Sequence, residues 1–506
     1  MRSKKYFYNS VTSLICQLVT MICGFILPRF MLTSFGSEIN GAVTSISQFL
    51  GYISLLEAGV GGVTRAALYG PIAKGDSFQI NGIINATQRF FRKIALLFLL
   101  YSLVLSCSFK SISNTELSWS FVALLVAVLS VGTFSQYYFG ITYSILLNAD
   151  QSSYIINGLQ ILTVILNTVV SIFLLKLECN VHIVKLASVA IYAIRPIVLN
   201  IIGKHKFNID KTIPADNLSI RRRWNGLGHH IAYYVHNNVD VMVITIFLGL
   251  KYSSVYSIYG MILFGIKNVV MTLSNSAEAA LGDIIARDEE SVLKNRFALV
   301  ETLTSLASVV LFTTAGLLIF DFIEIYTMGV NDINYKIIPF GIIFAISEAL
   351  HAIKQNYHSL IMAAGHYKET QLGAFIEAGL NLVLSLVLAT CWGLVGIVLA
   401  TAISTLYRTI EYVIYLRKNI IHRSACVFVK RIAVNMICSI ISIIVSMAMP
   451  FSITNNYFEW ILKAIPVFAI TAIVTFGINF IVYKNDMNQI VSKIVSIIGF
   501  KRGDAK

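Results

Sequence analysis

Two stripes of polar side chains at helical spacing are the features of this sequence that could bind or move a polar ligand. The first lies in the apolar run from 226 to 249 and comprises His229, Tyr233, His236, Asn237 and Asp240. At about 100° per residue, these positions share one face of a helix. Pointing such groups at lipid would cost several kcal/mol. The stripe therefore predicts either a wet path for a ligand or hydrogen bonds to neighbouring helices.

The second stripe carries more charge. It comprises Glu348, His351, Gln355 and His358 on one helical face, with Lys354 at its margin. We expect these side chains to line a wet lumen, and packing between helices is the alternative. Four more ionisable residues in or beside other apolar runs complete the candidate lumen set: Arg29, Glu57, Arg65 and Lys267.

Nothing in the sequence indicates catalysis. It contains no Walker A, GxSxG or HExxH motif, and no DxD pair of the kind that metal-dependent sugar transferases use. His229 and His236 are about 10 Å apart along a helix axis, too far to share one metal ion, although His236 and Asp240 are close enough. We therefore predict neither an enzyme nor a bound cofactor. The acid and histidine groups leave proton or sodium coupling open.

The composition shows what must position these stripes. Of 506 residues, 57% are hydrophobic and only 13% are charged, and the mean hydropathy is +0.75, which is typical of a polytopic membrane protein. The net charge of +14 does not indicate nucleic-acid binding, because the basic residues recur in short loops between apolar runs. The seven cysteines form no CxxC pair, so no disulfide frame or metal site is expected.

Apolar runs of about 20 residues predict an all-α protein with about 14 transmembrane helices. Their approximate limits are 9–33, 40–62, 88–109, 119–147, 153–176, 183–203, 226–249, 252–277, 297–322, 336–363, 369–390, 393–416, 429–450 and 458–483. The run at 9–33 lacks a small-residue cleavage site, so we expect a retained span rather than a signal peptide. Lys and Arg gather in alternate loops, which predicts that both termini are cytoplasmic.

An internal repeat divides the chain. The segment Phe35–Val43 resembles Leu248–Tyr256, and Ser144–Asp150 resembles Ser359–Gly365, at offsets of 213 and 215 residues. Two matches at nearly one offset predict two pseudo-symmetric six-helix lobes. We expect an N-terminal lobe at 1–205, a cytoplasmic linker at 206–225 and a C-terminal lobe at 226–418. Two further helices and a cytoplasmic tail then occupy 419–506.

Several short motifs resemble a known family. They are Leu27–Phe30, Phe35–Gly36, Leu55–Gly61 and Ala67–Pro71 near the N-terminus, and His229–Asp240. These look like the Wzx-type polysaccharide flippases of O-antigen and capsule repeat units. That family belongs to the MATE-like multidrug/oligosaccharidyl-lipid/polysaccharide exporter superfamily. The resemblance implies a multi-pass protein of the bacterial inner membrane, with two lobes around a V-shaped cavity.

The resemblance also implies a function. Such a protein would translocate undecaprenyl-pyrophosphate-linked oligosaccharide by alternating access, for lipopolysaccharide or capsule biosynthesis. Its partners would be the lipid-linked oligosaccharide, membrane lipid, a polysaccharide polymerase and a chain-length regulator, and not nucleic acid. Cationic lumen residues would face the pyrophosphate, here Arg29, Arg65, Lys267 and Lys354. The main alternative is an ion-coupled exporter of small cationic or drug-like molecules, in which Asp240 and Glu348 would bind the cargo. A membrane-embedded sugar transferase or polymerase is disfavoured, because the outer loops are short.

Overall fold

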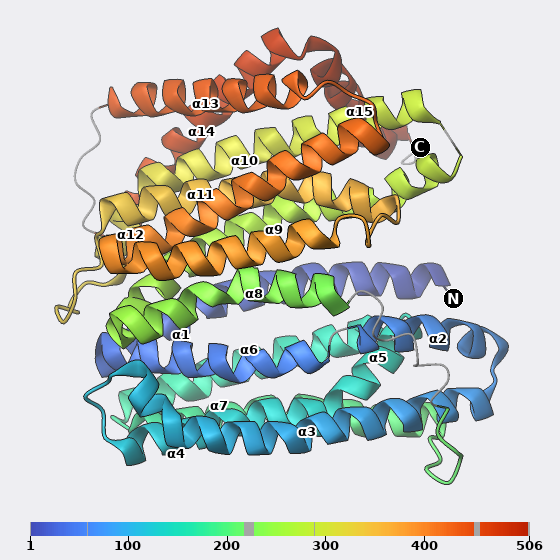
Figure 1. Cartoon of the computed structure of the whole chain (residues 1–506), viewed down its shortest axis with the longest axis vertical. Helices are drawn as coiled ribbons and strands as arrows, with labels where there is room; N and C mark the ends of the chain where they lie inside the picture. Colours follow the sequence, from blue (N-terminus) through green and yellow to red (C-terminus); the bar gives the residue numbers. More distant parts are fainter. Residues whose placement is uncertain (1, 58, 217–226, 288, 450–455, 504–506) are drawn as a thin grey trace. The chain divides into compact units, whose positions relative to one another are not determined.

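The computed structural model describes residues 2–57, 59–216, 227–287, 289–449 and 456–503, and this part of the chain folds into helices with no strand (Figure 1). The helices of the first half are α1 (Arg2–Gly51), η1 (Tyr52–Leu56), α2 (Val60–Lys74), α3 (Ser77–Ser113), α4 (Trp119–Ser135), η2 (Gln136–Gly140), α5 (Ile141–Ala149), α6 (Ser153–Lys176) and α7 (Val181–Phe207). Those that follow are α8 (Leu227–Val243), η4 (Ile244–Leu248), α9 (Leu250–Ala286), α10 (Glu290–Tyr326), α11 (Ile338–Ala363), α12 (Gln371–Asn419), α13 (Cys426–Met447), α14 (Tyr457–Val482) and α15 (Lys484–Gly503).

The prediction of an all-α polytopic membrane protein is confirmed. In the described residues, 11 helices are long and apolar enough to cross a membrane. Two of them, Phe7–Leu56 and Gln371–Asn419, each contain two of the predicted spans, and each consists of two helices that meet at a non-helical kink at Gly36 or Gly393. The predicted span at 336–363 corresponds to α11, which is not among these 11 helices. This helix carries the second polar stripe.

The backbone carries the internal repeat that the sequence predicts. Residues with positive φ recur 213 to 215 residues apart, in the pairs Gly36 and Gly249, Asn114 and Gly329, Gln151 and Gly365, Glu178 and Gly393, and Asn208 and His422. Such residues are uncommon outside glycine, so matched positions indicate matched turns. The hydrogen bonds at one corner match as well, because Ser152 N–H donates to the Leu147 carbonyl and His366 N–H to the Ile361 carbonyl.

The described chain forms two compact units. Unit 1 consists of Met1–Ser257 with Gly329–Ile333, and unit 2 of Ile258–Met328 with Asn334–Lys506. The boundary between them runs through α9, because the first turns of this helix pack within unit 1. Asn40 on α1 donates to Ser254 Oγ at 2.7 Å, for example. The lobe limits drawn from the sequence remain predictions.

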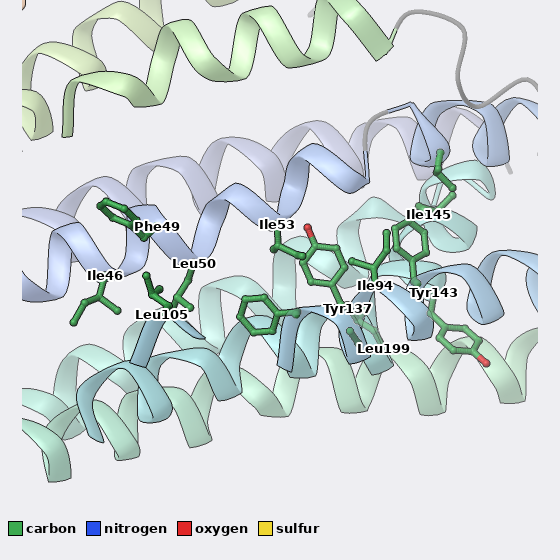
Figure 2. Close-up of a cluster of buried hydrophobic side chains, with 14 of the residues drawn as sticks. Ile46, Phe49, Leu50, Ile53, Ile94, Leu105, Tyr137, Tyr143, Ile145 and Leu199 are labelled. Carbon is green, nitrogen blue, oxygen red and sulfur yellow. The ribbon is translucent and has the colours of Figure 1, made fainter. Parts of the chain in front are cut away.

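Unit 1 has an apolar core between α1, α3, α5 and α7. Figure 2 shows Ile46 and Leu50 of α1 in this cluster with Leu105 of α3, and all three are buried. Small residues let the helix backbones approach closely, as is usual in membranes. A Cβ on Gly140 would lie 2.5 Å from the Pro196 Cβ, so α7 packs directly on η2.

A buried polar cluster connects several helices within unit 2. Glu301 on α10 is 1% exposed and accepts two hydrogen bonds from the Arg423 guanidinium, at 2.5 and 2.7 Å. Tyr357 of α11 donates its O–H to the same carboxylate at 2.7 Å. Arg431 on α13 lies 3.9 Å from both Glu301 and Asp486 of α15. These contacts connect four helices, α10, α11, α13 and α15.

The C-terminal segment differs from the tail that the sequence predicts, because it forms the helix α15. Met487 and Ile490 are buried against Leu299 and Leu306 of α10. The pattern of apolar residues in this segment is short, and its charged face lowers the mean hydropathy. The sequence therefore predicts only a cytoplasmic tail here, and the structure shows an amphipathic helix whose apolar side packs on α10.

Candidate functional site

The intramembrane charges of unit 2 form ion pairs. Lys267 on α9 lies 2.6 Å from Glu348 on α11, and their side chains are 12% and 5% exposed. One and a half turns further along α11, Lys354 lies 2.5 Å from Glu377 on α12, with both side chains under a tenth exposed. Both lysines thus pair with a carboxylate on another helix. Each pair satisfies charges that lipid could not solvate.

Arg408 extends the second pair along α12. Its Nε lies 3.6 Å from Glu377, and one of its terminal nitrogens pairs with Glu411. The other donates to the Thr370 carbonyl at 2.8 Å. Together with Lys267–Glu348, this gives three cations and three carboxylates. The group is therefore neutral as a whole, and the predicted basic residues are already partnered within unit 2.

The remaining residues of the α11 stripe lie in a polar, buried surface. His351 is 3% exposed. Gln355 donates to Asn275 Oδ1 at 2.8 Å, and His358 Nδ1 lies 3.0 Å from the Tyr412 hydroxyl. Tyr412 also carries Arg408 over its ring, 4.1 Å from the centroid. The stripe and the ion pairs are thus one continuous polar region made by α9, α11 and α12.

The α8 stripe lies in unit 1, and its side chains differ in how much of their surface is exposed. His236 and Asp240 are 3% and 4% exposed, and the Tyr256 hydroxyl donates to Asp240 at 3.1 Å. Tyr233 is 56% exposed, and Asn237 donates to the Tyr233 carbonyl. The side chain of His229 lies outside the described part of the chain. Two stripe residues are therefore buried and two are accessible.

The other candidates from unit 1 are spread along its first helices. Glu57, just after η1, accepts a hydrogen bond from Tyr137 at 3.1 Å. The turn there depends on Gly59, whose φ of 84° favours glycine. Arg29 is partly buried in α1, and Arg65 is exposed on α2. The structure does not gather these three residues around one another.

This arrangement can hold charges but offers no metal centre. Within the described residues, no group of three or more His, Cys, Asp or Glu side chains could hold a metal ion. Glu348 and Glu377 each face a lysine, so a proton or cation that neutralised either carboxylate would also release its partner. The polar region is therefore suited to exchange between internal pairs and a charged ligand.

Sequence reasoning missed how the residues combine. Spacing along one helix pairs Arg408 with Glu411, three residues away, but Arg408 also reaches Glu377 on the other side of the kink in α12. Helical spacing finds residues on one face and cannot find contacts across a kink such as that at Gly393. An aromatic ring such as that of Tyr357 could offer a flat face to sugars if it were accessible. Tyr357 is 1% exposed and bound to Glu301, so its ring is not available.

Comparison with known proteins identifies solved structures that have the same fold. The sequence matches no protein-family model and no curated protein. Among solved structures, it is similar to the lipid II flippase MurJ in an inward closed conformation, with a TM-score of 0.70 and 14% identity over 92% of this chain and 98% of that one. An inward-facing multidrug resistance MATE family transporter of the MOP superfamily gives a TM-score of 0.62 and 13% identity, over 81% and 97%. The MATE multidrug transporter DinF-BH gives 0.54 and 13%, over 83% and 97%. The chain thus has the fold shared by MurJ and the MATE transporters.

Proposed function

We propose that this protein is a flippase that translocates undecaprenyl-pyrophosphate-linked oligosaccharide repeat units across the bacterial inner membrane by alternating access, for surface polysaccharide biosynthesis. A polymerase and a chain-length regulator would use the product at the outer face. The observation that carries the proposal is the polar region of α9, α11 and α12. Its ion pairs Lys267–Glu348 and Lys354–Glu377 join α11 to α9 and α12, two helices that are long and apolar enough to cross a membrane, in a chain with the fold of a lipid II flippase.

The physical task fits these residues. A pyrophosphate and its sugars cannot enter hydrocarbon unaided, because unpaired charges and hydroxyls there cost several kcal/mol or more. A flippase need only solvate the head group while the prenyl tail remains in lipid. Ion pairs such as Lys354–Glu377 can open to offer the lysine to a phosphate and close when it leaves. Such pairing keeps the path stable when no substrate is bound.

The direction of transport also follows from electrostatics. An inside-negative potential favours outward movement of an anionic head group, by roughly 2.3 kcal/mol per charge per 100 mV. Two negative charges would thus bias export without a coupling ion. Proton or sodium coupling through the buried carboxylates or histidines would add to this bias.

The first test replaces Lys354 in cells. Lys354→Ala removes the cation that pairs with Glu377, so we expect surface polysaccharide to fall at least about tenfold, the loss that one strong phosphate contact represents. Lys336→Ala is the matched control, because it breaks an exposed pair with Glu324 and should change little. Both proteins are quantified in the membrane fraction. Normal polysaccharide with Lys354→Ala at normal protein level would contradict the assigned role.

The second candidate function is export of small cationic or drug-like molecules, which the likeness to MATE transporters favours. In that case the carboxylates Asp240 and Glu348 would bind the cargo. Glu348 already has Lys267 as a partner in unit 2, which disfavours a second cation there. Deleting the gene separates the two functions, because the flippase predicts lost surface polysaccharide and the exporter predicts lost drug resistance.

A further inference from the structure

Unit 1 contains a cavity that the proposed transport path does not use. It has a volume of about 580 Å³, and residues of α1, α4, η2, α6 and α7 line it. This is within the roughly 300–1,000 Å³ of small-molecule sites, and larger than a halide ion requires. The lining residues of α6, between Gln160 and Thr168, lie near the middle of that helix. The cavity is therefore at bilayer depth.

The only charged side chain that lines the cavity, among the described residues, is Arg195. No Asp or Glu lines it, and in the described part of the chain Arg195 makes no ion pair with a carboxylate within 4.0 Å. Tyr192, one turn away on α7, remains 36% exposed, so the cavity is not sealed. A guanidinium held at this depth without a carboxylate favours an anionic ligand. Phosphate suits it best, because its oxygens can accept two parallel hydrogen bonds from one arginine.

The walls also present acceptors that lack donors. Pro28 and Pro196 line the cavity and have no N–H, so the carbonyls of Gly24 and Tyr192 lose their usual intrahelical partner. Both of those residues line the cavity too. Gln160 Oε1 is buried without a hydrogen-bond partner. A bare anion would leave these acceptors unsatisfied, whereas hydroxyl groups on the ligand would donate to them.

From these contacts, we propose that the cavity of unit 1 binds a hydroxyl-bearing phosphate ester, with the phosphate on Arg195 and the hydroxyls on the acceptors of α1, α6 and α7. Such a ligand is either a soluble sugar or glycerol phosphate or the head group of a lipid. The site lies within unit 1 and shares no residue with the polar region of unit 2. This proposal does not depend on which substrate the protein transports.

Cys23 lines the cavity and reports on it directly. The probe is a full-length protein in which Cys23 is the only thiol, because the other cysteines are replaced by serine or alanine: Cys16, Cys107, Cys179, Cys391, Cys426 and Cys438. Its reaction with a negatively charged and a positively charged methanethiosulfonate is followed by intact mass. The ratio of the two rates measures the local potential at Cys23.

We expect Arg195→Gln to lower the ratio of anionic to cationic labelling at least about fivefold, since it removes the one charge among the described residues that line the cavity. Arg195→Lys should restore most of the ratio. Lys176→Gln is the matched control, because it removes an exposed charge from α6 outside the cavity and should leave the ratio unchanged. An equal ratio in Arg195→Gln and the parent, or no labelling of Cys23 by either reagent, would overturn the proposal.

Protection of Cys23 from labelling distinguishes a soluble ligand from a lipid head group. This measurement needs no variant at Arg195. Glycerol 1-phosphate, inorganic phosphate, and nanodiscs of phosphatidylglycerol or phosphatidylcholine are the probes. Slower labelling with glycerol 1-phosphate than with inorganic phosphate supports a soluble ester, and slower labelling only in phosphatidylglycerol supports a lipid head group. Filling the cavity with Gly24→Leu, where a Cβ meets no atom within 4 Å, should abolish protection. Protection by none of the four probes would contradict the site, whatever the transport assay shows.

Discussion

At the scale of single residues, the account depends on buried charges that are paired. Removing one member of such a pair leaves an uncompensated charge and typically costs about 3–5 kcal/mol, whereas removing both can be nearly neutral. Lys267 and Glu348 form a pair of this kind, since they are 2.6 Å apart and 12% or less exposed. The pair is therefore expected to be strongly coupled.

The corresponding prediction is a double-mutant cycle. Lys267→Met or Glu348→Gln alone should lower the melting temperature of the purified protein markedly, and the double variant should regain most of the loss. Melting is followed by size-exclusion chromatography after heating in detergent. Additive losses in the double variant would show that the two residues do not depend on each other.

Residue-level prediction from the sequence had a clear limit. The ionisable residues at bilayer depth, including Lys267, Glu348 and Lys354, could be identified from apolar context and helical spacing alone. Their pairing could not be predicted, because Lys267–Glu348 and Lys354–Glu377 each join two different helices. Arg195 directly precedes Pro196 in the sequence, and nothing in its spacing indicates a cavity.

At the scale of helices, glycines with positive φ set the corners. Gly36 lies inside α1 with φ 77° and ψ 179°, a region that is essentially restricted to glycine. A Cβ there would also lie 3.1 Å from Asp332 Oδ2. The same corner recurs at Gly249, with φ 91° and ψ 173°. The repeat is thus built from backbone conformations that few other residues adopt.

We predict that Gly36→Ala destabilises the protein by about 1–3 kcal/mol. Gly24→Ala on the same helix is the matched control, because a Cβ there meets no atom within 4 Å. It should be neutral or stabilise by up to about 1 kcal/mol. Thermal melting of both variants beside the parent provides the measurement. Equal melting temperatures for the two variants would refute the role of Gly36 as an obligatory corner.

The cluster at Glu301 gives a second prediction at this scale. Glu301→Gln removes the charge that Arg423 and Arg431 share, so we expect a loss of about 3 kcal/mol of stability. Glu290→Gln, also on α10, breaks only a pair with Lys294 that is 39–50% exposed, and should cost no more than about 0.5 kcal/mol. Limited proteolysis, with cleavage C-terminal to α13, measures whether α15 has loosened from α10. A protease pattern unchanged by Glu301→Gln would contradict the connecting role.

At the scale of the whole chain, the sequence predicted most of the fold. Apolar run lengths located most of the spans, because a bilayer fixes how long a spanning helix must be. The lobe limits drawn from the repeat remain predictions. The kinked elements α1 and α12 each contain two of the predicted spans, which meet at a glycine corner at Gly36 or Gly393. The helix α15 was not predicted, because an amphipathic helix lacks the apolar length that identifies spans.

The proposed function is transport of a lipid-linked sugar phosphate across a bilayer, and reconstituted vesicles test it most directly. The purified protein is placed in liposomes with a fluorescent polyprenyl-pyrophosphate oligosaccharide, and dithionite quenches only the label in the outer leaflet. In protein-free liposomes, about half of the label is quenched. With the parent protein, we predict that nearly all of it is quenched. With Lys354→Ala quenching should stay near half, because the Lys354–Glu377 pair is lost. Quenching that stops at half with correctly folded parent protein, as in protein-free liposomes, would contradict the account.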